Sequence, residues 1–225
     1  MVAHILGRVR RYTDLVSTLR ALGPGDRAPE FTLPAVPGDG NVSLAHYRGK
    51  SAVLLGLFRG LHCPFCRRQI FQLSGMHDTL AGMDITTVAV VNTPRPRAEL
   101  YFRYHPVRVV LLADPEALTH QAFGVPSVVL DESFAAVRVN PTGELPGPMH
   151  PMEANSALNA KDGFVLTPVD EAVFNAHGTQ LGGHFLIDRD GIVRWSAIEA
   201  QHGVADLTRF PAPAEILTAA RTLGR

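Results

Sequence analysis

The sequence has little of several features that point to particular classes of protein. Among its 225 residues are two cysteines and one tryptophan, and its 21 lysines and arginines balance 21 aspartates and glutamates. Two cysteines cannot build the disulfide framework of a small secreted domain. Without an excess of positive charge, the chain lacks the electrostatic footprint of a protein that binds nucleic acid or an acidic membrane surface.

Long apolar runs are also missing. No stretch approaches the ~18 uninterrupted apolar residues of a membrane-spanning helix, and the N-terminus shows no secretory apolar region with a small-residue cleavage site. We therefore expect a cytoplasmic protein without a membrane partner. Arginines near the N-terminus also occur in organelle transit peptides, but apolar residues at helical spacing favour a packed helical extension over residues 1–22.

A Gly-Pro-Gly turn at residues 23–25 separates this extension from the rest of the chain. Residues 23–225 are expected to form one domain, since domains commonly hold roughly 100–200 residues. Apolar patterning predicts peripheral strands over 28–33 and 42–44, buried strands over 51–58, 85–91 and 107–112, and helices over 66–80, 94–105 and 117–123. Strands that alternate with helices predict an α/β fold.

The second half is less regular. Residues 126–166 lose periodicity, so we expect an insertion over about 126–178 that is irregular until a helix capped by Thr167. Its apolar residues leave three roles open: a lid beside the cysteines, a dimer contact, or a passive cover over a sheet edge. A turn at 188–191 predicts a final hairpin, and residues 213–223 a closing helix.

Both cysteines stand together as Cys63-Pro64-Phe65-Cys66, directly after a buried strand and before a helical pattern. Proline fits the first helical position, so we expect Cys63 at the N-cap and Cys66 one turn further in. Unpaired N–H groups and the helix dipole favour the thiolate there. The pattern predicts an exposed, nucleophilic Cys63 and a protected Cys66 that closes a disulfide with it.

Two other interpretations of the pair are weighed against redox chemistry. Buried structural cysteines would act as small apolar side chains, and a zinc site needs four ligands, for which the histidines supply no suitably spaced downstream pair. We favour redox chemistry without a metal or bound cofactor. Arg59 and His62 are candidate supporting residues, because a positive charge near the sulfur lowers its pKa. For the neighbouring Arg67 and Arg68, a solvated helix face is an equal alternative.

Residues 25–33 (GDRAPEFTL), the strand and cysteine motif over 51–66, and residues 185–194 (FLIDRDGIVR) together resemble thioredoxin-fold proteins. The chain is most similar to the peroxiredoxin-like group of the alkyl hydroperoxide reductase/thiol-specific antioxidant (AhpC/TSA) family. This resemblance implies a central mixed sheet flanked by helices. It also implies thiol-dependent reduction of hydrogen peroxide or organic hydroperoxides through Cys63 and Cys66, a thioredoxin-like, glutaredoxin-like or small-thiol reductant, and a homodimer.

The chain departs from the family pattern near the cysteines. Typical peroxiredoxins have proline seven residues and threonine three residues before the attacking cysteine, where this chain has Gly56 and Gly60. Near Gly182, family peroxidases have an arginine and thioredoxins a cis-proline. These departures leave two alternatives open: protein disulfide exchange without peroxidase activity, and a noncatalytic redox-sensing or binding module.

Overall fold

Seven strands form one sheet in the computed structural model, which describes residues 20–224. The strands are β1 (Thr32–Val36), β2 (Asn41–Ser43), β3 (Ala52–Phe58), β4 (Ile85–Val91), β5 (Val110–Ala113), β6 (Gly183–Ile187) and β7 (Val193–Ile198). Their order is β2-β1-β5-β4-β3-β6-β7, with β3, β4 and β5 parallel and the remaining pairings antiparallel. The mixed sheet confirms the expected fold class, whereas the helix expected over 1–22 lies almost wholly outside the described residues.

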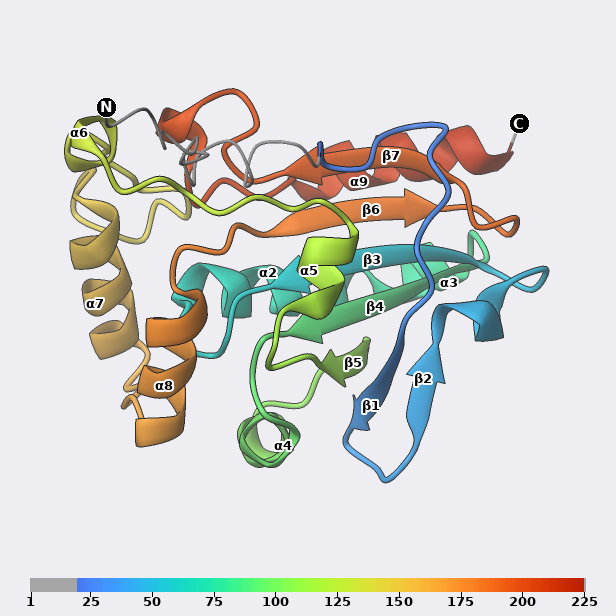
Figure 1. The fold of residues 1–225 in the computed structure, drawn as a ribbon, viewed down its shortest axis with the longest axis horizontal. Helices are drawn as coiled ribbons and strands as arrows, with labels where there is room; N and C mark the ends of the chain where they lie inside the picture. The colour runs from blue at the N-terminus through green and yellow to red at the C-terminus, as the bar shows by residue number, and fades with distance from the viewer. Residues whose placement is uncertain (1–19, 225) are drawn as a thin grey trace, which may run out of the picture.

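Helices cover both faces of this sheet (Figure 1). They are α2 (Pro64–Gly75), α3 (His77–Ala81), α4 (Arg95–Tyr104), α5 (Leu118–Ala122), α6 (Glu132–Ala135), α7 (Pro151–Lys161), α8 (Pro168–His177) and α9 (Pro213–Ala220). Three short 3-10 turns complete the list: η1 (Leu44–Tyr47), η2 (Val204–Asp206) and η3 (Arg221–Gly224). None of the helices in the described part of the chain is long and apolar enough to cross a membrane.

β3 lies inside the sheet and carries the chain to the cysteines. All seven of its residues are buried, because neighbouring strands flank it and helices pack on both faces. It pairs with β4 from Ala52 to Phe58 and with β6 from Val53 to Leu57. The helix expected over 66–80 is divided at Met76 into α2 and α3, next to Gly75, which weakens helical continuation.

The insertion, residues 126–178, is more regular than expected. The expectation of an irregular segment over 126–166 is wrong, because α6 and α7 lie within it. α7 begins at Pro151 after His150, whose ring accepts a hydrogen bond from the Met152 N–H. Besides Pro151, only Ala154 and Leu158 supply buried apolar side chains to α7, so the helix lacks the broad apolar face by which periodicity reveals a helix.

α8 and the final hairpin follow their sequence signals. Thr167 and Asp170 form the reciprocal capping box that starts α8, and Gly178 ends the helix. At the hairpin between β6 and β7, Asp188 Oδ1 accepts hydrogen bonds from two backbone N–H groups, and Gly191 has a φ of 81°. In Figure 1, α7 and α8 both lie beyond the end of β3, where the cysteine motif begins, and residues of both helices line one pocket.

Candidate active site

Cys63 is the N-cap of α2, and Pro64 occupies the first helical position. The backbone at Cys63 is extended, with φ −91° and ψ 102°, so its side chain turns back over the helix start. Cys63 Sγ accepts a hydrogen bond from the Cys66 N–H at 3.1 Å. The predicted N-cap position is confirmed. In the reduced protein, this N–H and the helix dipole stabilise negative charge on Cys63.

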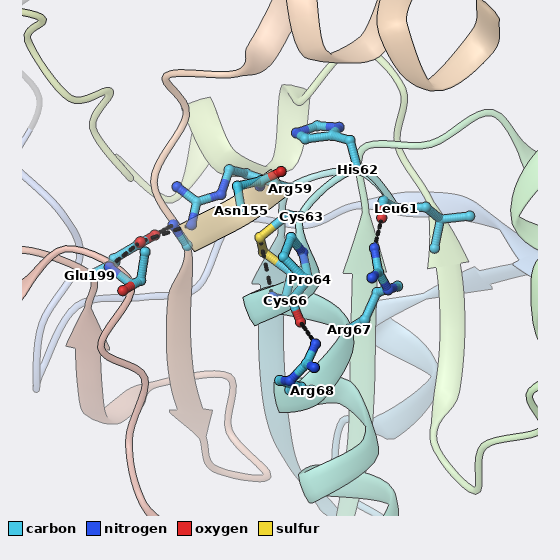
Figure 2. The surroundings of a disulfide bond; sticks show 12 residues. Arg59, Leu61, His62, Cys63, Pro64, Cys66, Arg67, Arg68, Asn155 and Glu199 are labelled. Carbon is cyan, nitrogen blue, oxygen red and sulfur yellow. Dashed lines mark hydrogen bonds and ion pairs between the residues drawn. A yellow bond between two sulfur atoms is a disulfide. The ribbon is translucent and has the colours of Figure 1, made fainter. Parts of the chain in front are cut away.

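The sulfurs of Cys63 and Cys66 lie at disulfide distance, with their Cα atoms 5.3 Å apart (Figure 2). The expected exposure of Cys63 is wrong, because each cysteine is only 1% exposed. Cys63 nevertheless lines a pocket of about 280 Å³ that Cys66 does not line. The pocket therefore reaches Cys63 and not Cys66, while the roles of an attacking and a resolving sulfur stay predictions.

The insertion supplies most of the apolar wall of this pocket. The apolar wall residues from the insertion are Val128, Leu130, Phe134, Pro151, Met152, Phe174 and Ala176. They come from the segment before α6 and from all three helices of the insertion. This position agrees with the first of the three roles considered for the insertion, a lid beside the cysteines; the dimer contact and the passive cover over a sheet edge stay predictions.

Arg59 lines the same pocket and is held by a buried carboxylate. Its Nη2 lies 2.8 Å from Glu199 Oε1, with the two side chains 8% and 0% exposed. The same carboxylate accepts hydrogen bonds from the backbone N–H groups of Gly182 and Thr208, at 2.8 and 2.7 Å. Figure 2 shows the arginine extended toward this acid. Sequence reasoning missed Glu199, which follows β7 and carries no local motif.

His62 packs under the insertion against Phe174, with ring centroids 5.3 Å apart. Burial, with the nearby charge of Arg59, lowers the pKa of His62 to about 4. The ring is therefore neutral near pH 7 and cannot supply the positive charge expected from it. Neither of its ring nitrogens has a hydrogen-bond partner among residues 20–224.

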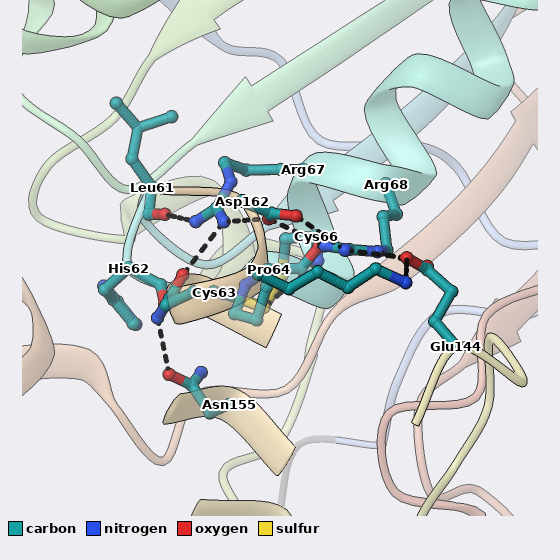
Figure 3. A network of polar contacts seen from close by, with 12 residues as sticks. Leu61, His62, Cys63, Pro64, Cys66, Arg67, Arg68, Glu144, Asn155 and Asp162 are labelled. Carbon is teal, nitrogen blue, oxygen red and sulfur yellow. Dashed lines mark hydrogen bonds and ion pairs between the residues drawn. A yellow bond between two sulfur atoms is a disulfide. The ribbon is translucent and has the colours of Figure 1, made fainter. Parts of the chain in front are cut away.

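Arg67 and Arg68 join α2 to the insertion (Figure 3). Arg67 is 2% exposed and donates hydrogen bonds to Asn159 Oδ1 at 2.9 Å and Asp162 Oδ2 at 2.6 Å. Arg68 forms ion pairs with Asp162 and Glu144, at 2.8 and 2.6 Å. A solvated helix face therefore does not describe these arginines. They form a latch, by which we mean Arg67, Arg68, Glu144, Asn159 and Asp162.

The acids of the latch are charged at neutral pH. Hydrogen bonding from Arg68 lowers the pKa of Glu144 to about 2, against the opposing effect of burial. Burial alone would raise the pKa of Asp162, but hydrogen bonds from Arg68 and Arg67 outweigh it and lower the pKa. Both carboxylates thus remain ionised partners of the arginines.

The latch also fixes the loop before the cysteines. The Leu61 carbonyl accepts a hydrogen bond from Arg67, and the His62 carbonyl accepts one from Asn159 Nδ2 at 3.1 Å. At the start of the loop, the Leu61 N–H donates to Thr93 Oγ1 at 3.0 Å. Two elements distant in sequence, α7 and the segment after β4, therefore set the position from which α2 begins.

Glycines stand at two positions of the family pattern because neighbouring side chains fill the space. A Cβ at Gly60 would lie 2.7 Å from Val173 Cγ1 on α8, and a Cβ at Gly182 would lie 2.7 Å from Phe210 Cε1. Neither a threonine at the first position nor an arginine at the second fits without repacking. Across the described residues, no group of three or more His, Cys, Asp or Glu side chains is arranged to hold a metal ion.

Comparison with known proteins agrees with this geometry. The model of the AhpC/TSA family matches residues 24–196. A peroxiredoxin of Mycobacterium tuberculosis, recorded in two strains, is 34% identical over 106 residues, which is 46% of this chain and 64% of the relative. The matched region thus spans slightly less than two thirds of those relatives' own length.

Solved structures share the fold. Peroxidoxin BcpB of Mycobacterium tuberculosis has a TM-score of 0.56 at 16% identity, covering 90% of this chain and 97% of its own. The reduced 2-Cys peroxiredoxin of Plasmodium vivax has a TM-score of 0.59 at 17% identity, covering 90% and 82%. The thiol:disulfide interchange protein DsbE of Chlorobium tepidum has a TM-score of 0.53 at 19% identity, covering 89% and 99%. The fold is thioredoxin-like, and since the family model spans the sheet, the cysteine helix and most of the closing hairpin, the chain belongs to the AhpC/TSA family.

Proposed function

We propose that the protein is a thiol-dependent oxidoreductase that reduces hydrogen peroxide or an organic hydroperoxide, with Cys63 attacking and Cys66 resolving. One observation carries the proposal: Cys63 Sγ stands at the N-cap of α2, borders a pocket, and lies at disulfide distance from Cys66. A helix N-terminus stabilises the thiolate form that attacks peroxide. Membership of the AhpC/TSA family supports the same chemistry.

The cycle transfers two electrons from the cysteines to the peroxide. The Cys63 thiolate attacks the terminal peroxide oxygen, an S–O bond forms, and the O–O bond breaks. The leaving oxygen takes a proton and departs as an alcohol, or as water from hydrogen peroxide, which leaves Cys63 as a sulfenic acid. The Cys66 thiol, losing its proton, attacks this sulfur; the disulfide forms and hydroxide leaves, protonated to water.

Intact-mass analysis of the reduced protein after addition of one equivalent of peroxide tests the proposal. We expect the wild type to lose two hydrogens and to consume peroxide at a rate that Cys63→Ser abolishes. In Cys66→Ser we expect a sulfenic acid at Cys63, which dimedone captures. An undiminished peroxide rate in Cys63→Ser would disprove the assignment of the nucleophile.

Protein disulfide exchange without peroxidase activity is the second candidate. The packing around Gly60 and Gly182 favours it, because neighbouring side chains fill the space that a side chain would need there. Typical family peroxidases have a threonine at the first position and an arginine near the second, and this chain has neither. An insulin reduction assay separates the candidates: activity there, with no peroxide consumption, selects disulfide exchange. Activity in neither assay selects a noncatalytic redox-sensing or binding module.

We also propose the reductant, the compartment and the oligomeric state of the protein. Electrons return from a thioredoxin-like, glutaredoxin-like or small-thiol reductant, and a reducing compartment such as the cytoplasm suits a pair that cycles between dithiol and disulfide. Residues 23–225 act as one thioredoxin-like domain after a helical extension over 1–22. We propose a homodimer, which light scattering coupled to size-exclusion chromatography tests: a mass of twice 24.4 kDa is expected.

A further inference from the structure

The pocket beside Cys63 combines an apolar wall with buried polar atoms that lack partners. His62 and Thr208 line it and are 2% and 4% exposed. Within the described part of the chain, no hydrogen-bond partner reaches either His62 nitrogen or Thr208 Oγ1. Buried polar atoms without partners destabilise a protein, so a ligand that hydrogen-bonds to them is favoured.

The charge of the pocket favours an uncharged ligand. Among the described residues that line it, Arg59 alone carries a charge, and Glu199 already neutralises that charge. The remaining wall offers aliphatic and aromatic side chains, including Leu130, Met152 and Phe174. An ionised ligand would lose its hydration without gaining an unpaired counter-charge, whereas apolar surface gains from burial.

The buried position of the disulfide restricts which reductants can reach it, according to their size. Each cysteine is 1% exposed, and the latch holds the insertion over the start of α2. A protein dithiol has to bring its own sulfur into line with Cys63 Sγ, and the insertion covers that approach. A volume of about 280 Å³ is near the lower end of the range for small-molecule sites.

We infer that the reductant of the Cys63–Cys66 disulfide is a small thiol with an apolar body and no charged group besides its reacting sulfur, bound in this pocket, and not a protein dithiol. The inference rests on the proposed function, since it concerns the return half of the same cycle. It selects one of the reductant classes that the family resemblance leaves open. Cys63 is the sulfur attacked, because it borders the pocket and Cys66 does not.

Two molecules of thiol complete the reduction. The first, as thiolate, attacks Cys63 Sγ; a mixed disulfide forms, the bond to Cys66 breaks, and Cys66 leaves as a thiolate that gains a proton. The second attacks the small-molecule sulfur of the mixed disulfide and releases Cys63 as thiolate. The products are one small-molecule disulfide and the protein dithiol, so two electrons pass from the thiols to the protein.

The test starts from the oxidised protein and measures the rate at which the disulfide is lost. The probes are 6-mercapto-1-hexanol, 6-mercaptohexanoate and 2-mercaptoethanol at equal thiolate concentration, and a bacterial thioredoxin kept reduced by its reductase. Samples are quenched with an alkylating agent and weighed by mass spectrometry. We expect mercaptohexanol to react at least ~10-fold faster than 2-mercaptoethanol, because the pocket buries its additional methylenes. We expect the same advantage over 6-mercaptohexanoate, because the pocket offers no unpaired counter-charge to a carboxylate, and a faster reaction than with thioredoxin at equal concentration.

Two substitutions at residues of similar exposure show whether the pocket causes the preference for mercaptohexanol. Met152 lines the pocket and Val169 does not, and they are 45% and 41% exposed on neighbouring helices of the insertion. Met152→Glu is expected to reduce the advantage of mercaptohexanol to about twofold or less, and Val169→Glu to preserve it. Leu130→Glu, at 63% exposure on the pocket wall, repeats the test if the first variant fails to fold.

Faster reduction by thioredoxin, equal rates for the three small thiols, or the same effect of Met152→Glu and Val169→Glu would each overturn the inference. No peroxide is present in this experiment, so the two proposals fail separately. A protein that prefers mercaptohexanol but ignores peroxide contradicts the peroxidase proposal alone. A protein that reacts with peroxide but shows no preference among the thiols contradicts only the inference about the reductant.

Discussion

The carboxylate of Glu199 and the guanidinium of Arg59 meet 2.8 Å apart in the interior, although 140 residues separate them in sequence. The same acid binds the backbone of Gly182 and of Thr208. Three segments that surround the cysteines thus depend on one side chain. Replacing Glu199 by a neutral residue leaves the Arg59 cation buried without a counter-charge, and an unpaired buried charge strongly destabilises the folded protein.

We therefore expect Glu199→Gln to lower the free energy of unfolding by about 3–5 kcal/mol. Asp39→Asn is the control, since Asp39 pairs with Arg95 at a fully exposed carboxylate and its replacement should leave stability nearly unchanged. Urea denaturation followed by circular dichroism measures both. Equal, small effects of the two substitutions would show that the buried pair is not a structural requirement.

Restoring a threonine at position 60 should destabilise the protein. Its Cβ would lie 2.7 Å from Val173 Cγ1, and overpacking of this kind typically costs about 1–3 kcal/mol. The double variant Gly60→Thr/Val173→Ala should recover part of that loss, measured against Val173→Ala alone by thermal unfolding. If Gly60→Thr costs the same with and without the valine, Val173 is not the obstacle.

Removing the carboxylate of Asp162 should loosen α7 locally. Asp162 accepts hydrogen bonds from both Arg67 and Arg68, and bonds to charged groups contribute about 1.5–3 kcal/mol. In Asp162→Asn, amide hydrogen exchange over residues 151–161 is expected to accelerate roughly tenfold or more. Exchange over 85–91 should stay unchanged as the internal control; uniform acceleration of both segments would point to global destabilisation instead.

Stability should decrease between pH 6.5 and about 3 because of three buried histidines. Burial lowers the pKa of His62 to about 4, and of His120 and His184 to about 3. The unfolded chain binds protons on these rings below about pH 6.5, while the folded chain does not. The contribution of the neutral histidines to the free energy of unfolding is therefore complete above pH 6.5. It decreases as the pH is lowered, by roughly 1–2 kcal/mol per histidine at pH 5.

Urea midpoints at pH 7.5, 6 and 5 measure this dependence. His184→Gln should reduce the pH slope by the contribution of one proton, and His120→Gln serves if that variant does not fold. The depressed carboxylate of Glu144 does not interfere, because its contribution is complete above about pH 4.5 and is lost only as the pH falls toward 2. Constant midpoints across the three buffers would contradict the burial of neutral rings.

The start of the site was predictable because its signals are local. A run of seven apolar residues, followed after a short loop by Cys63 and Pro64, specifies a strand and then a helix N-cap. Thr167 with Asp170 specifies the start of α8 in the same way. Such patterns act over one helical turn, so the residues themselves carry the information.

The partners of the site were not predictable because they depend on packing. Asp162 lies 95 residues from Arg67, and nothing in its neighbourhood distinguishes it from a surface acid. α7 has a narrow apolar face, so its periodicity is weak. The burial of Cys63 was missed for the same reason, because a prediction that lacks α7 leaves the first turn of α2 open to solvent.

The contact between Val173 and Gly60 links two parts of the chain that a sequence comparison would treat as separate. A homologue that lacks residues 126–178 has no methyl group above this loop, so it is free to carry a hydroxyl three positions before the first cysteine. Gain of the insertion and loss of that hydroxyl should therefore occur together along the lineages of such proteins.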